Sequence, residues 1–459
     1  MTLDTITGGE WILPPPPDFS PRRCVDDSRM IVPGDLFVAI KGELADGYAY
    51  IAAAAEKGAG IICADRGPSM ADLTTLRDLN VGYLLVGDAL EAFHAFAAFH
   101  RQTLPDLFLI AVTGSSGKTS IRSMIQAILE EAFPNQVIGT EGNTNNFFGV
   151  PRNVFRLRGC HRAAVLELGT NHPGEIARLA AMTRPDAAVV ANVGKAHIEF
   201  FGTQEAIARE KGAVFEALPA AGLAVMPVDG PGTAVLRAKA GNRPVTTFGA
   251  AESGADVEYD YRLNAEGGSR VNLFWRRSGA KAGFDWPLSG RHQAANAAAA
   301  AAVCGALALP VETIVRGLRE TALPGARMRV VEENGIMWRD DAYNSNPESA
   351  RASLEWFHEA AAESAGRLFV VLGDMLELGA DHAGEEHRQL LAFARKLLPE
   401  AEIIAVGNNM AQVKKHVKGV RGFADADAAG TWLRPRLRPG DQVLLKGSRG
   451  IHLERVRQP

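Results

Sequence analysis

A glycine-rich segment carries the most specific chemical pattern in this sequence. Residues 112–120 are VTGSSGKTS and lie between an apolar stretch and a segment with helical spacing. Glycines let backbone N–H groups curl around phosphate oxygens, and the N-terminus of the following helix adds a partial positive charge. The lysine of such a loop reaches the β- and γ-phosphates, and the next hydroxyl binds Mg²⁺. The predicted ATP-binding residues here are Gly114, Ser115, Ser116, Gly117, Lys118, Thr119 and Ser120.

An ordinary Gly/Ser turn that caps a helix is the alternative for this segment. The agreement of strand, loop, Lys-Thr pair and helix favours the phosphate loop. The loop is a short form, because the first glycine of the common pattern GxxxxGK[ST] would fall at Val112. This departure counts against a generic GTPase or ATPase and favours a narrower family.

Two residues further along the chain could complete a phosphate and metal site. Glu167 ends one predicted buried strand and His197 comes after another, and we expect both at the carboxyl edge of the sheet, where open α/β folds bind ligands. The simpler alternatives are a carboxylate that faces water and a hydrogen-bonded structural histidine. Lys211 lies in the helical segment 205–218. A solvated helix face is its default interpretation, because Mg²⁺ repels an ammonium group.

The elements that must position these residues alternate between strand and helix. Residues 107–114 are a continuous apolar run, typical of a strand buried on both faces of a parallel sheet. We therefore predict a βαβ domain. Residues 251–289 are typical of antiparallel strands, and the alanine-rich residues 294–303 predict a close-packed helix. The remaining buried strands of this region are predicted at 163–168, 187–193 and 223–226.

The length of 459 residues predicts three domains, at about 150 residues each. We place a small N-terminal α/β domain at 1–104, a central parallel-sheet domain with the phosphate loop at 105–322, and a C-terminal Rossmann-like domain at 323–459. The fold class is therefore α/β. The opening residues 1–19 end in PPPPDF and predict a stiff lead-in. Strands of the third domain are predicted at 337–341, 367–374, 402–407 and 441–448.

The composition excludes several classes of protein. Apolar residues make up 47% and charged residues 22%, which supports normal cores and excludes wholesale disorder. The 49 Lys and Arg against 53 Asp and Glu give a net charge of −4, which argues against a nucleic-acid binder. The four cysteines are far apart, so neither a zinc ribbon nor a disulfide framework is indicated. Without a signal sequence or a long apolar run, we expect a cytoplasmic monomer that does not insert into membranes.

Further motifs follow along almost the whole chain. They include EGNTNNFFGVP (141–151), ELGTNHPGEI (167–176), NVGKAHIEFFG (192–202), REKG (209–212) and GRHQAAN (290–296). With the phosphate loop, their order and spacing resemble the Mur ligase superfamily, ATP-dependent amide-forming enzymes of peptidoglycan synthesis. DDAYNSNP (340–347), GDMLELG (373–379) and KGSRGIHLE (446–454) resemble in particular the members that add D-alanyl-D-alanine to UDP-N-acetylmuramoyl-tripeptide.

The resemblance implies a reaction and its catalytic residues. The γ-phosphate of ATP passes to the terminal carboxylate of the tripeptide, and the amine of D-alanyl-D-alanine then displaces phosphate from the acyl phosphate. Such catalysis is mostly positioning and charge neutralisation. ATP and two Mg²⁺ ions are implied, with Lys211 carbamylated so that its side chain becomes anionic. The implied catalytic residues are Lys118, Lys211, His197 and Arg327, and the implied Mg²⁺ residues are Thr119, Glu167, His197 and Lys211.

The resemblance also assigns residues that bind the substrates. His292 and Asn296 match the adenine side of the ATP site, and Asp341 and Tyr343 match the ribose side. Without the family, NTNN would be interpreted as a turn and Arg449 as a surface arginine. The matching residues for the UDP-linked substrate and the dipeptide are Ser28, Arg29, Lys41, Gly42, Asp46, Gly47, Asn143, Asn145, Asn146, Asn344 and Arg449.

Other functions stay open at this point. The same fold could act on a single amino acid or a folate-type substrate, although the third-domain motifs favour the dipeptide. A non-catalytic nucleotide-binding module would be expected to lose some of Lys118, Glu167, His197 and Lys211, and all four are present. A small-molecule kinase would form ADP without an amide product.

Overall fold

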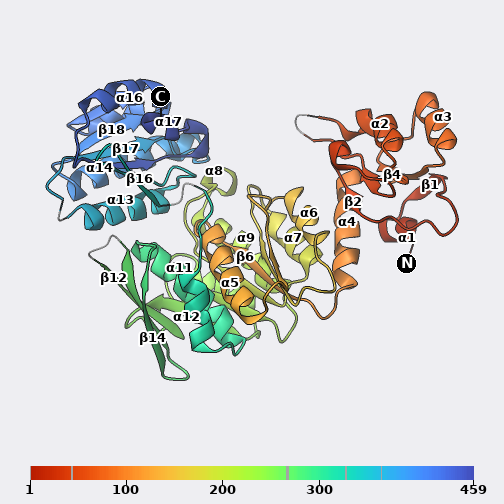
Figure 1. The fold of residues 1–459 in the computed structure, drawn as a ribbon, viewed down its shortest axis with the longest axis horizontal. Coiled ribbons are helices and arrows are strands. Elements are labelled where there is room, and N and C mark those ends of the chain that lie inside the picture. The colour runs from red at the N-terminus through yellow and green to blue at the C-terminus, as the bar shows by residue number, and fades with distance from the viewer. Residues whose placement is uncertain (1, 43–44, 265–267, 326–327, 363, 459) are drawn as a thin grey trace.

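The computed structural model describes residues 2–42, 45–264, 268–325, 328–362 and 364–458. These residues form three α/β lobes, each built on its own sheet (Figure 1). In Figure 1 the first lobe stands at one end of the molecule, and the third lobe lies against the central lobe at the other end. The predicted α/β fold with three sheets is confirmed.

The first lobe contains a five-stranded sheet in the order β1-β5-β4-β3-β2. Its strands are parallel except β1, which pairs antiparallel with β5. The predicted stiff lead-in is wrong for its first part, because residues 3–7 form a helix and β1 extends the sheet, with Trp11 packed on the core. The elements are α1 (Leu3–Thr7), β1 (Glu10–Leu13), β2 (Cys24–Val25), β3 (Leu36–Val38), α2 (Ile51–Glu56), β4 (Ile61–Ala64), α3 (Met70–Asp78), β5 (Gly82–Leu85) and α4 (Ala89–Gln102).

The central lobe contains a nine-stranded sheet in the order β14-β13-β12-β11-β10-β9-β6-β8-β7. Strands β6 to β12 run parallel, whereas β13 pairs antiparallel with both β12 and β14, as the sequence predicts. The strands are β6 (Phe108–Thr113), β7 (Val137–Gly139), β8 (Ala163–Glu167), β9 (Ala187–Val190), β10 (Leu223–Pro227), β11 (Val245–Ala250), β12 (Val257–Leu263), β13 (Ser269–Trp275) and β14 (Ala280–Trp286).

Helices cover both faces of this sheet, as the continuous apolar run of β6 requires. Leu109 and Ala111 face one core, whereas Ile110 and Val112 face the other. The predicted alanine-rich helix is confirmed as α11, whose small side chains let it pack closely on α5, β11 and β12. The helices are α5 (Lys118–Ala132), α6 (Gly149–Val154), α7 (Glu175–Thr183), α8 (Ile198–Phe201), α9 (Gln204–Glu216), α10 (Thr233–Ala240), α11 (Arg291–Ala306) and α12 (Val311–Arg319).

The third lobe contains a six-stranded sheet in the order β15-β16-β20-β17-β18-β19, parallel except for β15. The predicted domain boundaries at 104/105 and 322/323 fall in the connections before β6 and before β15, and they stay predictions. Among the described residues, no helix combines the length and apolar character needed to cross a membrane. The elements are β15 (Arg329–Glu333), β16 (Ile336–Asp340), α13 (Pro347–Ala361), β17 (Leu368–Gly373), α14 (Gly379–Leu397), β18 (Glu402–Val406), α15 (Asn408–Val413), β19 (Val420–Phe423), α16 (Ala426–Leu433), β20 (Gln442–Lys446) and α17 (Glu454–Arg457).

The packing of α12 on the phosphate-loop helix gives a stability prediction. A Cβ at Gly317 would lie 2.3 Å from the Cα of Ile128 in α5, so Gly317→Ala must push the two helices apart. We expect a loss of about 1–3 kcal/mol in the free energy of unfolding, measured by urea denaturation. Gly384→Ala in α14 is the control, because its Cβ would meet nothing within 4 Å. We expect that variant to gain about 0.5–1 kcal/mol, and equal effects of the two variants would contradict the argument.

Candidate active site

The predicted phosphate loop joins the end of β6 to the start of α5. Its two glycines are required by the backbone, since φ is +152° at Gly114 and +79° at Gly117. A Cβ at Gly117 would also lie 2.6 Å from Oδ1 of Asn296, so the loop packs tightly on α11. The Nζ of Lys118 donates to the carbonyl of Gly114 at 2.9 Å, which folds the lysine over the loop.

Asn192 braces the loop from the segment after β9. The amide of Ser115 donates to the Asn192 carbonyl at 3.1 Å, and the amide of Ser116 donates to its Oδ1 at 3.0 Å. The Asn192 side chain also donates to Oγ of Ser116 at 3.0 Å. Sequence reasoning missed this role. The predicted strand over 187–193 ends at Val190 instead, which frees Asn192 to turn toward the loop.

Glu167 lies directly beside the loop at the end of β8, which pairs with β6. Its carboxylate accepts one hydrogen bond from Oγ1 of Thr119 at 2.9 Å and another from Nδ2 of Asn145 at 2.8 Å. Only 1% of Glu167 is exposed, so the alternative of a carboxylate that faces water is wrong. The structure thus joins two of the predicted Mg²⁺ residues to one residue of the NTNN segment.

Lys211 lies in α9 with 1% exposure, so the default interpretation of a solvated helix face is wrong. Burial holds the pKa of the Lys211 amine well below its usual value. Repulsion by Lys118 lowers the pKa further, and the neighbouring Glu210 opposes the shift. The Glu210 carboxylate is itself engaged by the amides of Gly174 and Ile176.

His197 contacts the third lobe. It precedes α8 with φ +60°, and its Nδ1 lies 2.9 Å from Oε2 of Glu377, a residue with φ +69°. Although burial opposes ionisation of Glu377, hydrogen bonding to His197 and attraction by His197 and Lys118 leave the pKa of its carboxyl below the usual value. Of the predicted Mg²⁺ residues, Thr119 and Glu167 are therefore in direct contact, while His197 faces the GDMLELG segment.

The predicted adenine side lies between α11 and α13. His292 lines a cavity of about 290 Å³ together with Tyr259, Arg291 and Trp356. Asn296 is buried and donates to Oε1 of Gln293 at 3.0 Å. Thus His292 faces a cavity, whereas Asn296 packs beneath the phosphate loop.

The predicted ribose side is held by a lysine that sequence reasoning did not assign. Nζ of Lys446 donates to Asp341 at 2.7 Å and to the carbonyl of Asn344 at 2.8 Å. Ser353 also donates to the Asp341 carboxylate. Tyr343 is half-buried, and Asn344 and Arg449 are exposed. Arg327 lies outside the described residues.

The predicted UDP-side residues of the first lobe gather around two short 3-10 turns. Ser28 and Arg29 belong to the turn Ser28–Met30, and Gly47 begins the turn Gly47–Tyr50. The backbones of Lys41 and Asp46 form an isolated bridge next to Gly42. Arg66, which was not predicted, pairs with Asp46 at 2.7 Å and stacks on Tyr48.

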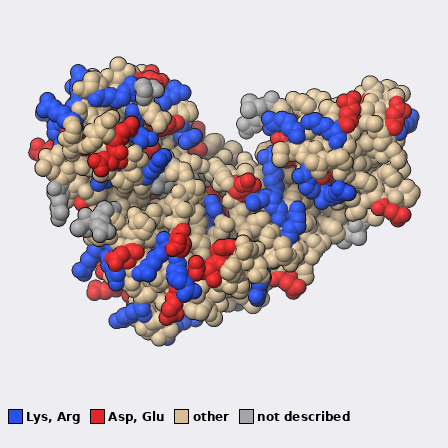
Figure 2. Space-filling view, in the orientation of Figure 1, with Lys and Arg blue, Asp and Glu red and all other residues tan. Residues whose placement is uncertain are grey.

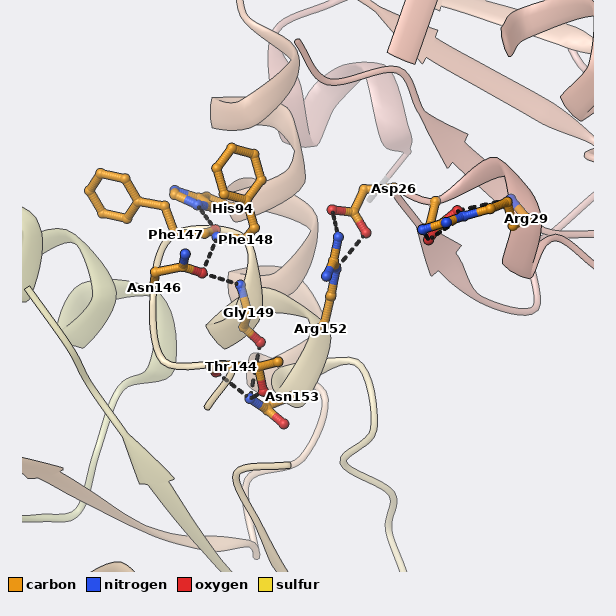
Figure 3. A network of polar contacts seen from close by, with 11 residues as sticks. Asp26, Arg29, His94, Thr144, Asn146, Phe147, Phe148, Gly149, Arg152 and Asn153 are labelled. Carbon is orange, nitrogen blue, oxygen red and sulfur yellow. Dashed lines mark hydrogen bonds and ion pairs between the residues drawn. The ribbon is translucent and has the colours of Figure 1, made fainter. Parts of the chain in front are cut away.

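The NTNN segment forms a loop before α6 (Figure 3). We name residues 141–148 the asparagine loop. Oδ1 of Asn146 accepts the amide of Gly149 at 2.9 Å, while Nδ2 of Asn153 donates to the carbonyl of Thr144 at 2.8 Å. Asn143 is exposed, and Asn145 turns toward Glu167. Asn153, which sequence reasoning missed, holds the loop on α6.

The oxygen donors at the loop suit Mg²⁺. Hydroxyl and carboxylate oxygens such as those of Thr119 and Glu167 are the ligands that Mg²⁺ prefers. Within the described ranges, no group of three His, Cys, Asp or Glu side chains is gathered that could hold a metal. An ion at this place would therefore depend on phosphate oxygens, as expected for Mg²⁺ bound with a nucleotide.

Comparison with known proteins shows which family this chain belongs to. The family model of the Mur ligase middle domain matches residues 112–304, and that of the Mur ligase, glutamate ligase domain matches residues 326–449. The UDP-N-acetylmuramoyl-tripeptide–D-alanyl-D-alanine ligase of Escherichia coli K12 is 34% identical over 94% of this chain and 91% of its own length. The crystal structure of MurF from Acinetobacter baumannii superposes with a TM-score of 0.89 at 30% identity, covering 99% and 96% of the two chains. MurF from Thermotoga maritima, in complex with ADP, gives a TM-score of 0.82 at 28% identity, covering 96% and 97%.

The three-lobe fold and the phosphate loop beside a buried carboxylate define a ligase of the Mur type. The names of these relatives give the same pair of substrates, and the match covers nearly the full length of this chain, through all three lobes. The chain belongs to the family of UDP-N-acetylmuramoyl-tripeptide–D-alanyl-D-alanine ligases. The resemblance inferred from the motifs is thereby confirmed.

The surroundings of His292 predict a pH dependence of stability. Burial lowers the pKa of His292 from 6.5 to about 4, with Lys446 adding to the shift and Asp341 opposing it. Between these values the unfolded chain binds a proton that the folded chain does not, so stability falls as pH drops from about 6.5 to about 4. His292→Asn should remove this part of the pH dependence in thermal unfolding without nucleotide. The exposed His172→Asn is the control, and parallel pH curves for wild type and His292→Asn would contradict the shift.

Proposed function

We propose that this chain joins D-alanyl-D-alanine to UDP-N-acetylmuramoyl-tripeptide, with ATP as phosphoryl donor, giving the UDP-linked pentapeptide of peptidoglycan synthesis. The observation that carries the proposal is the 34% identity over 94% of the chain to a ligase of that name. The ADP in the Thermotoga maritima relative supports the use of ATP. Because the reaction consumes ATP and a nucleotide-linked precursor, we place it in the cytoplasm.

In the first step, we assign the phosphate loop to ATP. A carboxylate is a poor electrophile, so an oxygen of the tripeptide carboxylate bonds to the γ-phosphorus, the β–γ bridge breaks, and ADP leaves. Lys118 would exchange its contact with the Gly114 carbonyl for the transferring phosphoryl group. Thr119 and Glu167 would hold Mg²⁺, which neutralises phosphate charge. Since Nδ1 of His197 faces Glu377, its Nε2 would serve a second ion.

The low pKa of Lys211 supports its carbamylation. Only a neutral amine attacks CO₂, and burial favours the neutral form of Lys211. The nitrogen bonds to the carbon of CO₂ and loses a proton, so the side chain becomes anionic. A carbamate would remove the repulsion between Lys211 and Lys118 and add oxygen donors for Mg²⁺.

In the second step, the amine of D-alanyl-D-alanine attacks the acyl carbon, and the tetrahedral intermediate expels phosphate. We assign Arg449, which is exposed on the third lobe, to the dipeptide carboxylate, with Asn344 on the same lobe. We assign the UDP-linked tripeptide to the first lobe and to the asparagine loop. Arg327 and the ribose-side residues Asp341 and Tyr343 would complete the ATP site.

Phosphate release with ATP and Mg²⁺ tests this function. We expect release only when both UDP-N-acetylmuramoyl-tripeptide and D-alanyl-D-alanine are present, together with a product of the pentapeptide mass. Omission of each substrate is the control. Release with a single amino acid in place of the dipeptide would overturn the acceptor assignment, and ADP formation without an amide would indicate a kinase.

Lys211 gives the sharpest prediction from this mechanism. Lys211→Ala removes the carbamate, and we expect turnover to fall by about 10²-fold or more, since a buried charge that stabilises the transition state is lost. Formate or acetate should partly restore activity by supplying a carboxylate. Lys239→Ala is the matched control, because Lys239 pairs with Glu216 on the neighbouring helix. Full activity of Lys211→Ala would remove this lysine from the mechanism.

A further inference from the structure

We propose that the ion pair between Asp26 and Arg152 positions the two halves of the UDP-substrate site relative to each other. Asp26 belongs to the first lobe and Arg152 to α6 of the central lobe. The inference rests on the proposed function, because it concerns the site of the UDP-linked tripeptide. It adds two positioning residues that lie outside the residues assigned to that site.

The geometry of the pair is that of a specific contact. Nε and Nη2 of Arg152 donate to the two carboxylate oxygens of Asp26, each at 2.8 Å. The side chain of Asp26 is 6% exposed and that of Arg152 is 48% exposed. A carboxylate that has lost most of its water is stable only with well-placed donors, and the bidentate guanidinium supplies two. The pair therefore fixes orientation as well as distance between the lobes.

On the first-lobe side, Asp26 adjoins the turn that carries the proposed UDP contacts. The next residue, Asp27, accepts the amide of Arg29 at 3.0 Å and so begins the turn that contains Ser28 and Arg29. The Arg29 guanidinium holds the pKa of Asp27 at about 2, so this carboxylate stays ionised at neutral pH. A fixed Asp26 therefore fixes Ser28 and Arg29.

On the central-lobe side, Arg152 precedes Asn153, which holds the asparagine loop on α6. Asn153 donates to Thr144, and Asn146 accepts the amide of Gly149 at the start of the helix. Figure 3 shows this loop and helix with Arg152 pointing toward Asp26. The ion pair thus connects the first lobe to the loop whose Asn145 reaches Glu167.

A second contact between the first lobe and the asparagine loop comes from α4. Nε2 of His94 in α4 lies 2.8 Å from the carbonyl of Phe147, at the end of the asparagine loop. His94 is 7% exposed, and burial lowers its pKa, which keeps it a neutral donor. The contacts at Phe147 and Arg152 both restrict the orientation of the loop and α6 relative to the first lobe. On the face shown in Figure 2, basic side chains gather at this junction, which suits the diphosphate of a UDP-linked substrate.

Direct binding of the diphosphate by Arg152 is the competing explanation. The guanidinium is half-exposed, and release from Asp26 would free it for phosphate. The two explanations predict different effects of Asp26→Asn on substrate binding. If Arg152 acts through Asp26, this variant weakens substrate binding. If Arg152 binds phosphate itself, the variant leaves binding unchanged or strengthens it.

The test is a double-mutant cycle with Asp26→Asn, Arg152→Gln, their combination, and the exchange Asp26→Arg with Arg152→Asp. The measurements are the Kd of UDP-N-acetylmuramoyl-tripeptide by calorimetry and the KM values of all three substrates. We expect each single variant to raise the Kd and KM of the UDP-substrate about fivefold, the double variant to add nothing further, and the exchange to recover part of the loss. KM for ATP should not change, which distinguishes positioning from general loss of structure.

Arg316→Gln is the matched control, because Arg316 pairs with Glu131 at 3.0 Å within the central lobe and has similar exposure. We expect it to leave the Kd unchanged. Additive single variants, an unchanged Asp26→Asn, or equal rises in every KM would overturn the inference while leaving the proposed function intact. A wild-type chain that binds no UDP-linked tripeptide would overturn the proposed function and this inference with it.

Discussion

The architecture of the site depends on the burial of one carboxylate. Glu167 ends β8 with 1% exposure, and removing a carboxylate from water is costly unless hydrogen-bond donors replace the lost solvent. Those donors come from two segments, the hydroxyl of Thr119 in α5 and the amide of Asn145 in the asparagine loop. A single charge therefore holds the phosphate-loop helix and the asparagine loop against the same strand end. The residues proposed for ATP binding and for substrate positioning therefore both contact Glu167.

The third lobe contacts the phosphate loop and the segment after β9 through hydrogen bonds to their backbone groups. The side chain of Asn346 caps α13 and donates to the Ser115 carbonyl at 3.4 Å, and Glu348 accepts the amide of Lys195 at 3.0 Å. A Cβ on Gly194 would lie 2.7 Å from the Glu348 carboxylate, so a larger residue would require the Glu348 side chain to move away from this contact. Because Gly194 also donates to Oγ of Ser115, the position of the third lobe is coupled to the conformation of the phosphate loop.

Local patterns predicted the features that depend on local physics. The apolar run of β6, the phosphate loop and the antiparallel strands after residue 251 formed as expected. Contacts between distant segments were harder to predict. The sequence around Asn192 and Asn153 does not distinguish them from asparagines in ordinary turns. The sequence around Lys211 indicates only that this residue lies on a helix. The packing of α9 against α10, β6 and β9 buries that lysine, and periodicity within one helix cannot reveal it. The edge strand β15 lacked a signal because its residues are mostly exposed.

The charge state of the buried Lys211 affects how the site binds its anionic ligands. Lys118 and Lys211 repel each other, and the Glu167 carboxylate already accepts hydrogen bonds from the neutral donors Thr119 and Asn145. The structure relieves this repulsion by favouring the uncharged amine of Lys211. ATP, a diphosphate and a carboxylate all bring negative charge to such a site, so each ligand is attracted by Lys118 and its backbone amides. The proposed carbamate on Lys211 would instead repel these anionic ligands, and a cation such as Mg²⁺ between them would offset that repulsion. The low pKa of Lys211 and the oxygen donors at Thr119 and Glu167 are thus two parts of one electrostatic arrangement.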